Sequence, residues 1–94
     1  MILQFEWDHE KDSINQKKHN ISFEEAKTVF GDQFSITIND PKHSLDEQRY
    51  IDIGLSDKLR LLVVIYTERG NKIRLISSRK ATSKERKIYE QSKY

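Results

Sequence analysis

The run Leu61-Leu-Val-Val-Ile-Tyr66 restricts the fold of this 94-residue chain more than any other feature. Side chains of a β-strand point alternately to the two faces of its sheet, and in this run both sets are apolar. The run is far too short to span a bilayer as a helix. It therefore predicts a strand in a central position of a sheet.

Shorter segments predict the other strands. Apolar residues alternate with polar ones in residues 2–6 and again from Phe34 to Ile38, and further strands are expected at residues 50–53 and 72–78. Residues 68–71 predict a hairpin turn between the last two strands. Consecutive strands joined by short turns pair antiparallel, so a meander of three or four antiparallel strands is expected.

Three helices are expected, and each has a recognisable start. Asp8 can cap the first helix, which Asn20 ends. Ser22 and Glu25 form a capping box at the second helix, in which the hydroxyl and the carboxylate would each accept a hydrogen bond from an unpaired backbone N–H. A second capping box, at residues 82–85, opens a helix near the C-terminus.

Together these elements predict a single α+β domain over residues 1–94. It consists of an antiparallel sheet of four to five strands, two N-terminal helices and a C-terminal helix. The helices can cover one face of the sheet.

Composition excludes several classes of site. The chain has no cysteine, which excludes disulfides, thiolate catalysis and cysteine-type zinc sites. Its three histidines are not spaced as metal ligands, and its three glycines are too scattered to form a phosphate-binding loop. No metal or cofactor is therefore expected. The N-terminus lacks a cationic segment followed by an apolar one, and we expect a cytoplasmic protein without membrane contact.

Charge is distributed unevenly along the chain. Residues 1–56 carry 6 Lys/Arg and 11 Asp/Glu, whereas residues 57–94 carry 11 and 4. Many of the cations crowd into residues 71–90, where a predicted strand runs into the last helix. Such a surface either faces a polyanion or is simply solvated.

Arginines carry the most specific signal in that region. Strict alternation places Arg79 on the same face of the last strand as Ile73 and Leu75, and Arg74 on the opposite face. Arg49 begins an earlier strand and can converge with Arg74 or Arg79 on one sheet surface. The planar guanidinium suits phosphate oxygens and keeps its charge at neutral pH.

Each of these residues also has a plainer interpretation. Arg49 can form a surface ion pair with the nearby Glu47. Tyr89 shares a helix face with Arg86, where it can either stack on a base or pack in the core. His19 is of the residue type that changes charge near neutral pH, so it can act as a general acid or base, or it can offset the dipole of its helix.

Read together, the segments resemble the BrnT family of toxins from bacterial type II toxin–antitoxin modules. One departure is Asn20, where the family usually has glycine, but asparagine tolerates the left-handed backbone almost as well. Ser78 stands where the family often has alanine. The matching blocks are FEWD at 5–8, KHNISFEEA at 18–26 with Val29-Phe30, Asp40-Pro41, EQRY at 47–50, Ile53-Gly54, LLVV at 61–64, TERG at 67–70, IRLISSR at 73–79, and Glu85-Arg86 with Tyr89.

The resemblance implies a fold similar to RelE-type ribonucleases and an endoribonuclease activity that blocks translation. It also implies neutralisation by a BrnA-like antitoxin that carries a DNA-binding domain. DNA would then be contacted through the antitoxin and not by this chain.

Combined with the cations, the resemblance leads to a hypothesis of metal-independent RNA cleavage, in which the ribose 2′-hydroxyl attacks its own phosphate. The alternative is a non-catalytic RNA-binding or antitoxin-docking module. The hypothesis assigns phosphate binding to Arg49, Arg74 and Arg79, proton transfer to His19 or else Lys18 or Glu47, and substrate orientation to Arg86, Tyr89 and Arg69.

Overall fold

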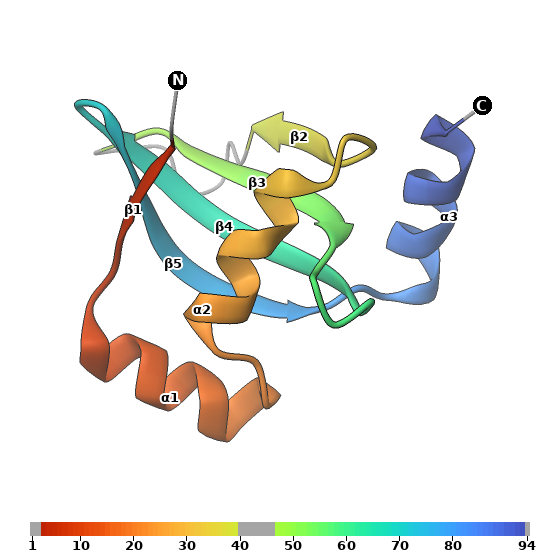
Figure 1. The fold of residues 1–94 in the computed structure, drawn as a ribbon. Helices are drawn as coiled ribbons and strands as arrows, with labels where there is room; N and C mark the ends of the chain where they lie inside the picture. Colours follow the sequence, from red (N-terminus) through yellow and green to blue (C-terminus); the bar gives the residue numbers. More distant parts are fainter. Residues whose placement is uncertain (1–2, 40–46, 94) are drawn as a thin grey trace.

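The computed structural model describes residues 3–39 and 47–93. None of the helices in these ranges is long and apolar enough to cross a membrane. Along the chain the elements are β1 (Gln4–Glu6), α1 (His9–His19), α2 (Phe23–Ala26), the 3-10 helix η1 (Lys27–Gly31), β2 (Ile36–Asn39), β3 (Arg49–Leu55), β4 (Leu61–Arg69), β5 (Lys72–Lys80) and α3 (Ser83–Ser92) (Figure 1).

The five strands form one sheet in the order β1-β5-β4-β3-β2. Strands β2 to β5 are an antiparallel meander, and β4 occupies the central position that its two-sided apolar run predicts. The expectation of a wholly antiparallel sheet is wrong, because β1 pairs parallel with β5. Residues 7–71 lie between these two strands, so no tight turn sets their relative direction.

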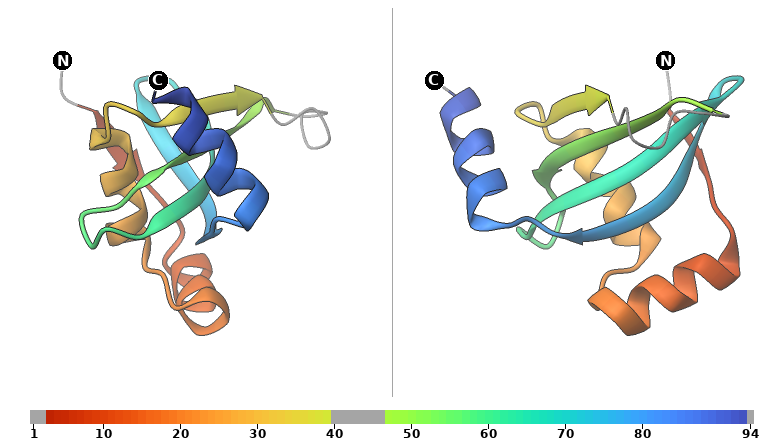
Figure 2. Two further views of the ribbon diagram at one scale, coloured as in Figure 1. Left: turned by 90° about the vertical axis from the view of Figure 1, so that its right-hand side faces the viewer. Right: turned by 180° about the vertical axis from the view of Figure 1, so that it is seen from behind.

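Alternation along β4 divides the core between the two faces of the sheet. We call the face that carries Leu62 and Val64 the covered face, because α2 and η1 pack against it through Phe23 and Val29. The other face, which we call the open face, carries Leu61, Val63 and Ile53. α2 and η1 therefore lie on one side of the sheet, α1 lies beside β5, and α3 stands at one end of the open face (Figure 2).

The first helix has the limits that its caps predict. The Asp8 side chain accepts hydrogen bonds from the backbone N–H groups of Glu10 and Lys11, at 2.8 and 3.1 Å. Asn20 ends the helix in the left-handed conformation, with φ of 59°, and its N–H donates to the Gln16 carbonyl. Asparagine thus replaces the glycine usual at such a helix end without loss of the stop.

The capping box at α2 is only half formed. Ser22 Oγ accepts from the Glu25 N–H at 3.1 Å, as expected, but the Glu25 carboxylate turns into the protein. There it accepts from Ser56 Oγ at 2.7 Å and from two nitrogens of Arg60, the Nε at 2.9 Å. The Arg60 hydrogen bond holds the pKa of Glu25 below its usual value despite burial. This carboxylate therefore joins α2 to the turn between β3 and β4.

Asn15 joins α1 to the sheet. Its side chain is buried, with Nδ2 donating to the Ile21 carbonyl at 2.8 Å and Oδ1 accepting from the Ser78 N–H at 3.0 Å. β1 pairs with β5 over residues 72–74, and Ser78 lies beyond that stretch. Asn15 therefore satisfies a backbone donor on an edge of β5 that β1 does not cover.

Two side chains of α3, those of Glu85 and Tyr89, fix the helix to the rest of the protein. The predicted capping box between Thr82 and Glu85 is complete. Glu85 also binds both terminal nitrogens of Arg79, each at 2.8 Å, which lowers the pKa of Glu85 to about 2. Tyr89 is 3% exposed, and its hydroxyl donates to Asp32 Oδ2 at 2.6 Å.

Replacing Asn15 should destabilise the protein strongly. In Asn15→Ala the Ile21 carbonyl and the Ser78 N–H lose their partner inside the protein, so we expect a loss of about 2–4 kcal/mol in the free energy of unfolding. Urea denaturation monitored by circular dichroism measures this loss. Gln16→Ala, at an exposed position of the same helix, is the matched control. Equal stability of the two variants would contradict the role given to Asn15.

Acid should weaken the link between Arg79 and Glu85. The pKa of Glu85 is lowered in the folded protein. The ionised carboxylate therefore contributes to the free energy of unfolding above about pH 4.5, and this contribution is lost as the pH falls towards about 2. We expect Glu85→Gln to be about 1 kcal/mol less stable than wild type at pH 7, because the pair is partly solvent-screened. That difference should vanish near pH 2. Glu90→Gln, on the exposed side of α3, should show no such convergence in the same urea titrations.

Candidate functional site

An irregularity in β5 determines which of its side chains share a face. In the pairing with β4, Ile65 lies opposite Ser77 and Tyr66 lies opposite Leu75, so Ile76 is an extra residue. Such a β-bulge shifts the alternation of side chains by one position. Residues on its two sides therefore follow opposite alternation patterns.

The bulge corrects the predicted orientation of two arginines. Leu75 belongs to the core of the covered face, so its neighbour Arg74 lies on the open face. Arg79 pairs with Val63, which also belongs to the open face. Arg74 and Arg79 thus share the open face. Ile73 and Leu75 lie on the covered face, so Arg79 does not share a face with them as strict alternation predicts.

Arg49 and Arg74 flank the same residue of the central strand. Arg49 pairs with Thr67 of β4, and Thr67 pairs with Arg74 of β5. Two strand spacings place the Cα atoms of the arginines roughly 10 Å apart, and both side chains point to the open face. The next pair along the strands is Arg69 and Lys72. We call these four residues, Arg49, Arg69, Lys72 and Arg74, the cationic end of the open face.

Two carboxylates lie within this cationic end. Arg74 Nη1 is 3.4 Å from Glu6 Oε2, and Arg69 Nη2 is 3.5 Å from Glu47 Oε2. The ion pair considered for Arg49 and Glu47 is therefore formed by Arg69 in the described part of the chain. The Nε of Arg49 is buried and has no hydrogen-bond partner among the described residues. A buried donor without a partner is costly, and an anion bound here would satisfy it.

The other predicted substrate contacts lie near α3. Val63, the partner of Arg79, is four residues from Thr67 along β4, which corresponds to about 13 Å. The bidentate contact with Glu85 raises the pKa of Arg79 and offsets its charge. Arg79 therefore lies on the same face as the cationic end but well away from it.

Two further predicted residues belong to α3 itself. Arg86 is exposed there. Tyr89 packs against Ile53 and Val63, and burial, followed by its hydrogen bond to Asp32, raises the pKa of the Tyr89 hydroxyl to about 12. This is the core-packing alternative considered for Tyr89, and it leaves little of the ring available for stacking.

Lys18 and His19 lie outside the cationic end. Both are in the last turn of α1, where the helix dipole favours positive charge. With Ile76 and Ser77 they line a hollow of about 170 Å³ between α1 and β5. The structure therefore brings Arg49, Arg69, Arg74 and Glu47 together but places these two residues beside the edge of the sheet.

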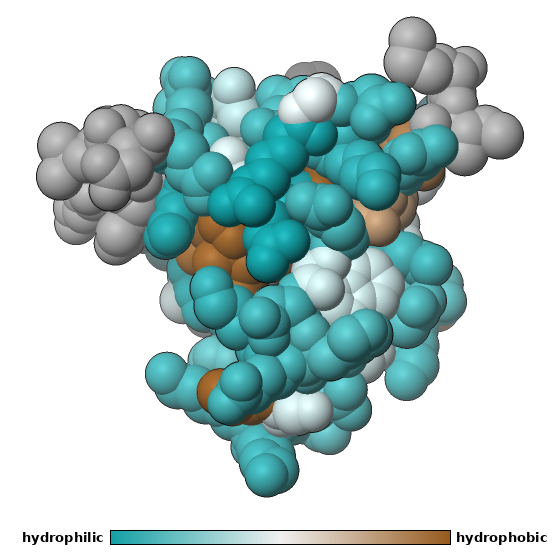
Figure 3. All heavy atoms as spheres, turned by 90° about the vertical axis from the view of Figure 1, so that its left-hand side faces the viewer, coloured by the Kyte–Doolittle hydropathy of each residue, from teal (hydrophilic) through white to brown (hydrophobic). Residues whose placement is uncertain are grey.

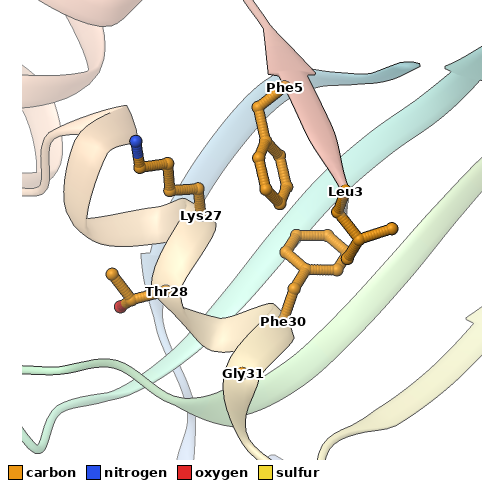
Figure 4. A pocket seen from close by; sticks show the side chains of 6 residues that line it. All are labelled: Leu3, Phe5, Lys27, Thr28, Phe30 and Gly31. Carbon is orange, nitrogen blue, oxygen red and sulfur yellow. The ribbon is translucent and has the colours of Figure 1, made fainter. Parts of the chain in front are cut away.

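A larger hollow lies between β1 and the segment of α2 and η1. Leu3, Phe5 and Phe30 give it an apolar wall, as Figure 4 shows, and its volume is about 550 Å³. Among the described residues that line it, the one titratable side chain is that of Lys27, which pairs with Glu24 at 2.9 Å. From the side that carries β1, apolar patches are separated by hydrophilic residues (Figure 3). The described lining is therefore apolar apart from Thr28 and this paired lysine.

Sequence reasoning missed Glu6, Thr67 and Lys72, which belong to the same part of the open face. Their proximity depends on the parallel pairing of β1 and on the β4–β5 register, for which the sequence carried no signal that we could read. Within residues 3–39 and 47–93, no group of three or more His, Asp or Glu side chains is arranged to hold a metal ion.

Comparison with known proteins identifies the family. The family model described as "Ribonuclease toxin, BrnT, of type II toxin-antitoxin system" matches residues 7–85. The crystal structure of the Brucella abortus ribonuclease toxin BrnT has a TM-score of 0.64 and 24% sequence identity, covering 87% of this chain and 100% of that chain. At this identity the match shows the fold. No curated protein sequence matches. Because the family model spans most of the chain, the protein belongs to the BrnT family of ribonuclease toxins of type II toxin–antitoxin systems.

Proposed function

We propose that this protein is a metal-independent endoribonuclease that blocks translation and is neutralised by a BrnA-like antitoxin. Membership of a ribonuclease toxin family supports cleavage of RNA in general. The observation that carries the proposed mechanism is the pair Arg49 and Arg74 on either side of Thr67, with a buried, unpartnered donor on Arg49 among the described residues.

The reaction needs fixed positive charge around one phosphate. The 2′-oxygen of the ribose attacks the adjacent phosphorus, the bond to the 5′-oxygen breaks, and the products are a 2′,3′-cyclic phosphate and a free 5′-hydroxyl. Negative charge grows on the non-bridging oxygens during the attack. Arg49 and Arg74 would bind those oxygens by charge-assisted hydrogen bonds, and the nucleophile belongs to the substrate itself, so no metal-activated water is required.

The remaining cations extend this site along the RNA. Arg69 and Lys72 occupy the next pair of positions towards the turn between β4 and β5. Arg79 and Arg86, at the α3 end, would contact other nucleotides of the strand and not the scissile phosphate. Tyr89 would serve indirectly, by holding α3 in place through Asp32.

Proton transfer requires one group to accept the 2′-hydroxyl proton and one to protonate the 5′-oxygen. Of the predicted candidates, Glu47 lies at the cationic end, beside Arg69. His19 and Lys18 line the hollow between α1 and β5, together with Ser77. We therefore assign proton abstraction to Glu47 in preference to His19 or Lys18.

One observation favours a second candidate function, RNA binding without cleavage. Both carboxylates of the cationic end are already paired with arginines. If those pairs persist when RNA binds, the site binds phosphate but lacks a free base. Incubation of end-labelled RNA with the purified protein in EDTA separates the two functions. New 2′,3′-cyclic phosphate ends indicate cleavage, and bound but intact RNA indicates the binding module.

Loss of either flanking arginine should slow cleavage. We expect Arg49→Ala and Arg74→Ala to reduce the rate by ~10²–10³-fold, the usual effect of removing one preorganised donor to a developing oxyanion. The rate of cyclic-phosphate formation in EDTA is the measurement. Lys17→Ala, which removes an exposed cation of α1, should retain the wild-type rate.

Binding of a non-cleavable RNA provides a second measurement on the same variants. With a 2′-O-methyl oligonucleotide, each arginine variant should reduce the salt dependence of the affinity by about one unit of slope, because one phosphate contact is lost. An unchanged rate together with an unchanged slope would remove Arg49 and Arg74 from the site.

The assignment of the base has its own test. Glu47→Gln should lower the single-turnover cleavage rate by ~10²-fold or more while retaining affinity for 2′-O-methyl RNA, because the amide cannot accept the proton. His19→Ala should have the smaller effect of the two. A larger effect of His19→Ala than of Glu47→Gln would instead assign proton transfer to His19, in the hollow between α1 and β5.

A further inference from the structure

A row of isoleucines crosses the open face beside the cationic end. Ile38 of β2 pairs with Ile51 of β3, and Ile51 pairs with Ile65 of β4. Residues paired across strands point to the same face, so the three side chains form a continuous apolar strip perpendicular to the strands. Ile38 is 49% exposed, and Ile51 and Ile65 are half-buried.

Nothing in the described part of the chain covers this isoleucine row. The contacts of α1, α2 and η1 are with the covered face and with β5. α3 approaches the open face at one end, where Tyr89 packs on Ile53, Leu61 and Val63 (Figure 2). The row therefore stands between α3 and the cationic end as an unpartnered apolar surface, which is typical of an interaction site.

The charges beside the row are predominantly positive. On β3, β4 and β5 the next described positions of this face are Arg49, Thr67 and Arg74, and beyond them Arg69 and Lys72 lie on β4 and β5. Against these four cations stand the carboxylates of Glu6 and Glu47, at 3.4 and 3.5 Å from their arginines. Counted over the described residues alone, the apolar strip is thus bordered on one side by four cations and two carboxylates, a net charge of +2.

We propose that an acidic amphipathic helix of the antitoxin lies across the strands on this isoleucine row, with its carboxylates facing the cationic end. Adjacent strands are about 4.8 Å apart, and apolar side chains at every third or fourth helical residue are about 5 Å apart. A helix across the strands can therefore place one apolar residue on each isoleucine. This proposal rests on the proposed function, since it makes the same arginines inaccessible to RNA.

Two other occupants fit the surface less well. RNA would use the cations, but isoleucine provides no hydrogen bond and no aromatic ring for stacking. The stacked rings of Tyr50 and Tyr66 belong to the covered face. A second copy of the chain would bring like charges together, because the open face is cationic and residues 57–94 are strongly basic. Charge complementarity therefore favours an acidic protein segment.

The decisive experiment compares two lysine substitutions at equally accessible isoleucines. A BrnA-like antitoxin is purified, and its affinity for each variant is measured by calorimetry. Ile38→Lys should weaken binding at least about tenfold, because one apolar contact is lost and a charge enters the row. Ile14→Lys, at a position on α1 that is 55% exposed, should bind as tightly as wild type. Equal affinity of the two variants would overturn the proposal.

RNA measurements separate failure of docking from failure of the proposed function. Ile38→Lys should cleave RNA at the wild-type rate, since isoleucine takes no part in the chemistry. Bound antitoxin should displace a labelled 2′-O-methyl oligonucleotide from the wild-type protein. Simultaneous binding of both would overturn the proposal even if the protein cleaves RNA. Conversely, the protein could fail to cleave RNA while Ile38→Lys still weakens antitoxin binding. That result would support the docking proposal and refute the proposed nuclease activity.

Discussion

The single extra residue in β5 is the constraint on which the candidate site depends. If β5 alternated strictly through Ile76, without the bulge, Arg74 would share a face with Ser78 and point away from Arg79. The position of β5 beyond the bulge is fixed by Asn15, which binds the Ser78 N–H from α1. A polar contact at the edge of the sheet thus helps to determine which cations meet on the open face.

The unequal cover of the two faces follows from the size of the chain. A domain of 94 residues buries a smaller share of its surface than a larger one, and here α2 and η1 complete a core on the covered face alone. On the open face, the core depends on Tyr89 of α3 and ends at the isoleucine row. The uncovered remainder is where a binding partner can contribute to stability as well as to regulation.

The sequence predicted local features better than long-range ones. The central place of β4, the caps at Asp8 and Thr82 and the helix stop at Asn20 depend on neighbouring residues, and they are confirmed. The parallel pairing of β1, the bulge at Ile76 and the inward turn of Glu25 depend on partners far away in the chain, and all three were missed. In the site, the sequence left open whether Arg49 converges with Arg74 or with Arg79, and the pairing of both Arg49 and Arg74 with Thr67 brings Arg74 nearer. The likeness to RelE-type ribonucleases stays a prediction.

RNA and an antitoxin would use the same cations, so the two ligands could not bind at the same time. Their affinities would nevertheless depend differently on the salt concentration. Binding of RNA through phosphates weakens steeply as salt rises, because it depends on the release of counterions. An antitoxin helix would gain part of its affinity from burying Ile38, Ile51 and Ile65, and salt does not screen that contribution. The isoleucine row would therefore let a protein partner prevail at cellular ionic strength over a substrate that binds the arginines alone.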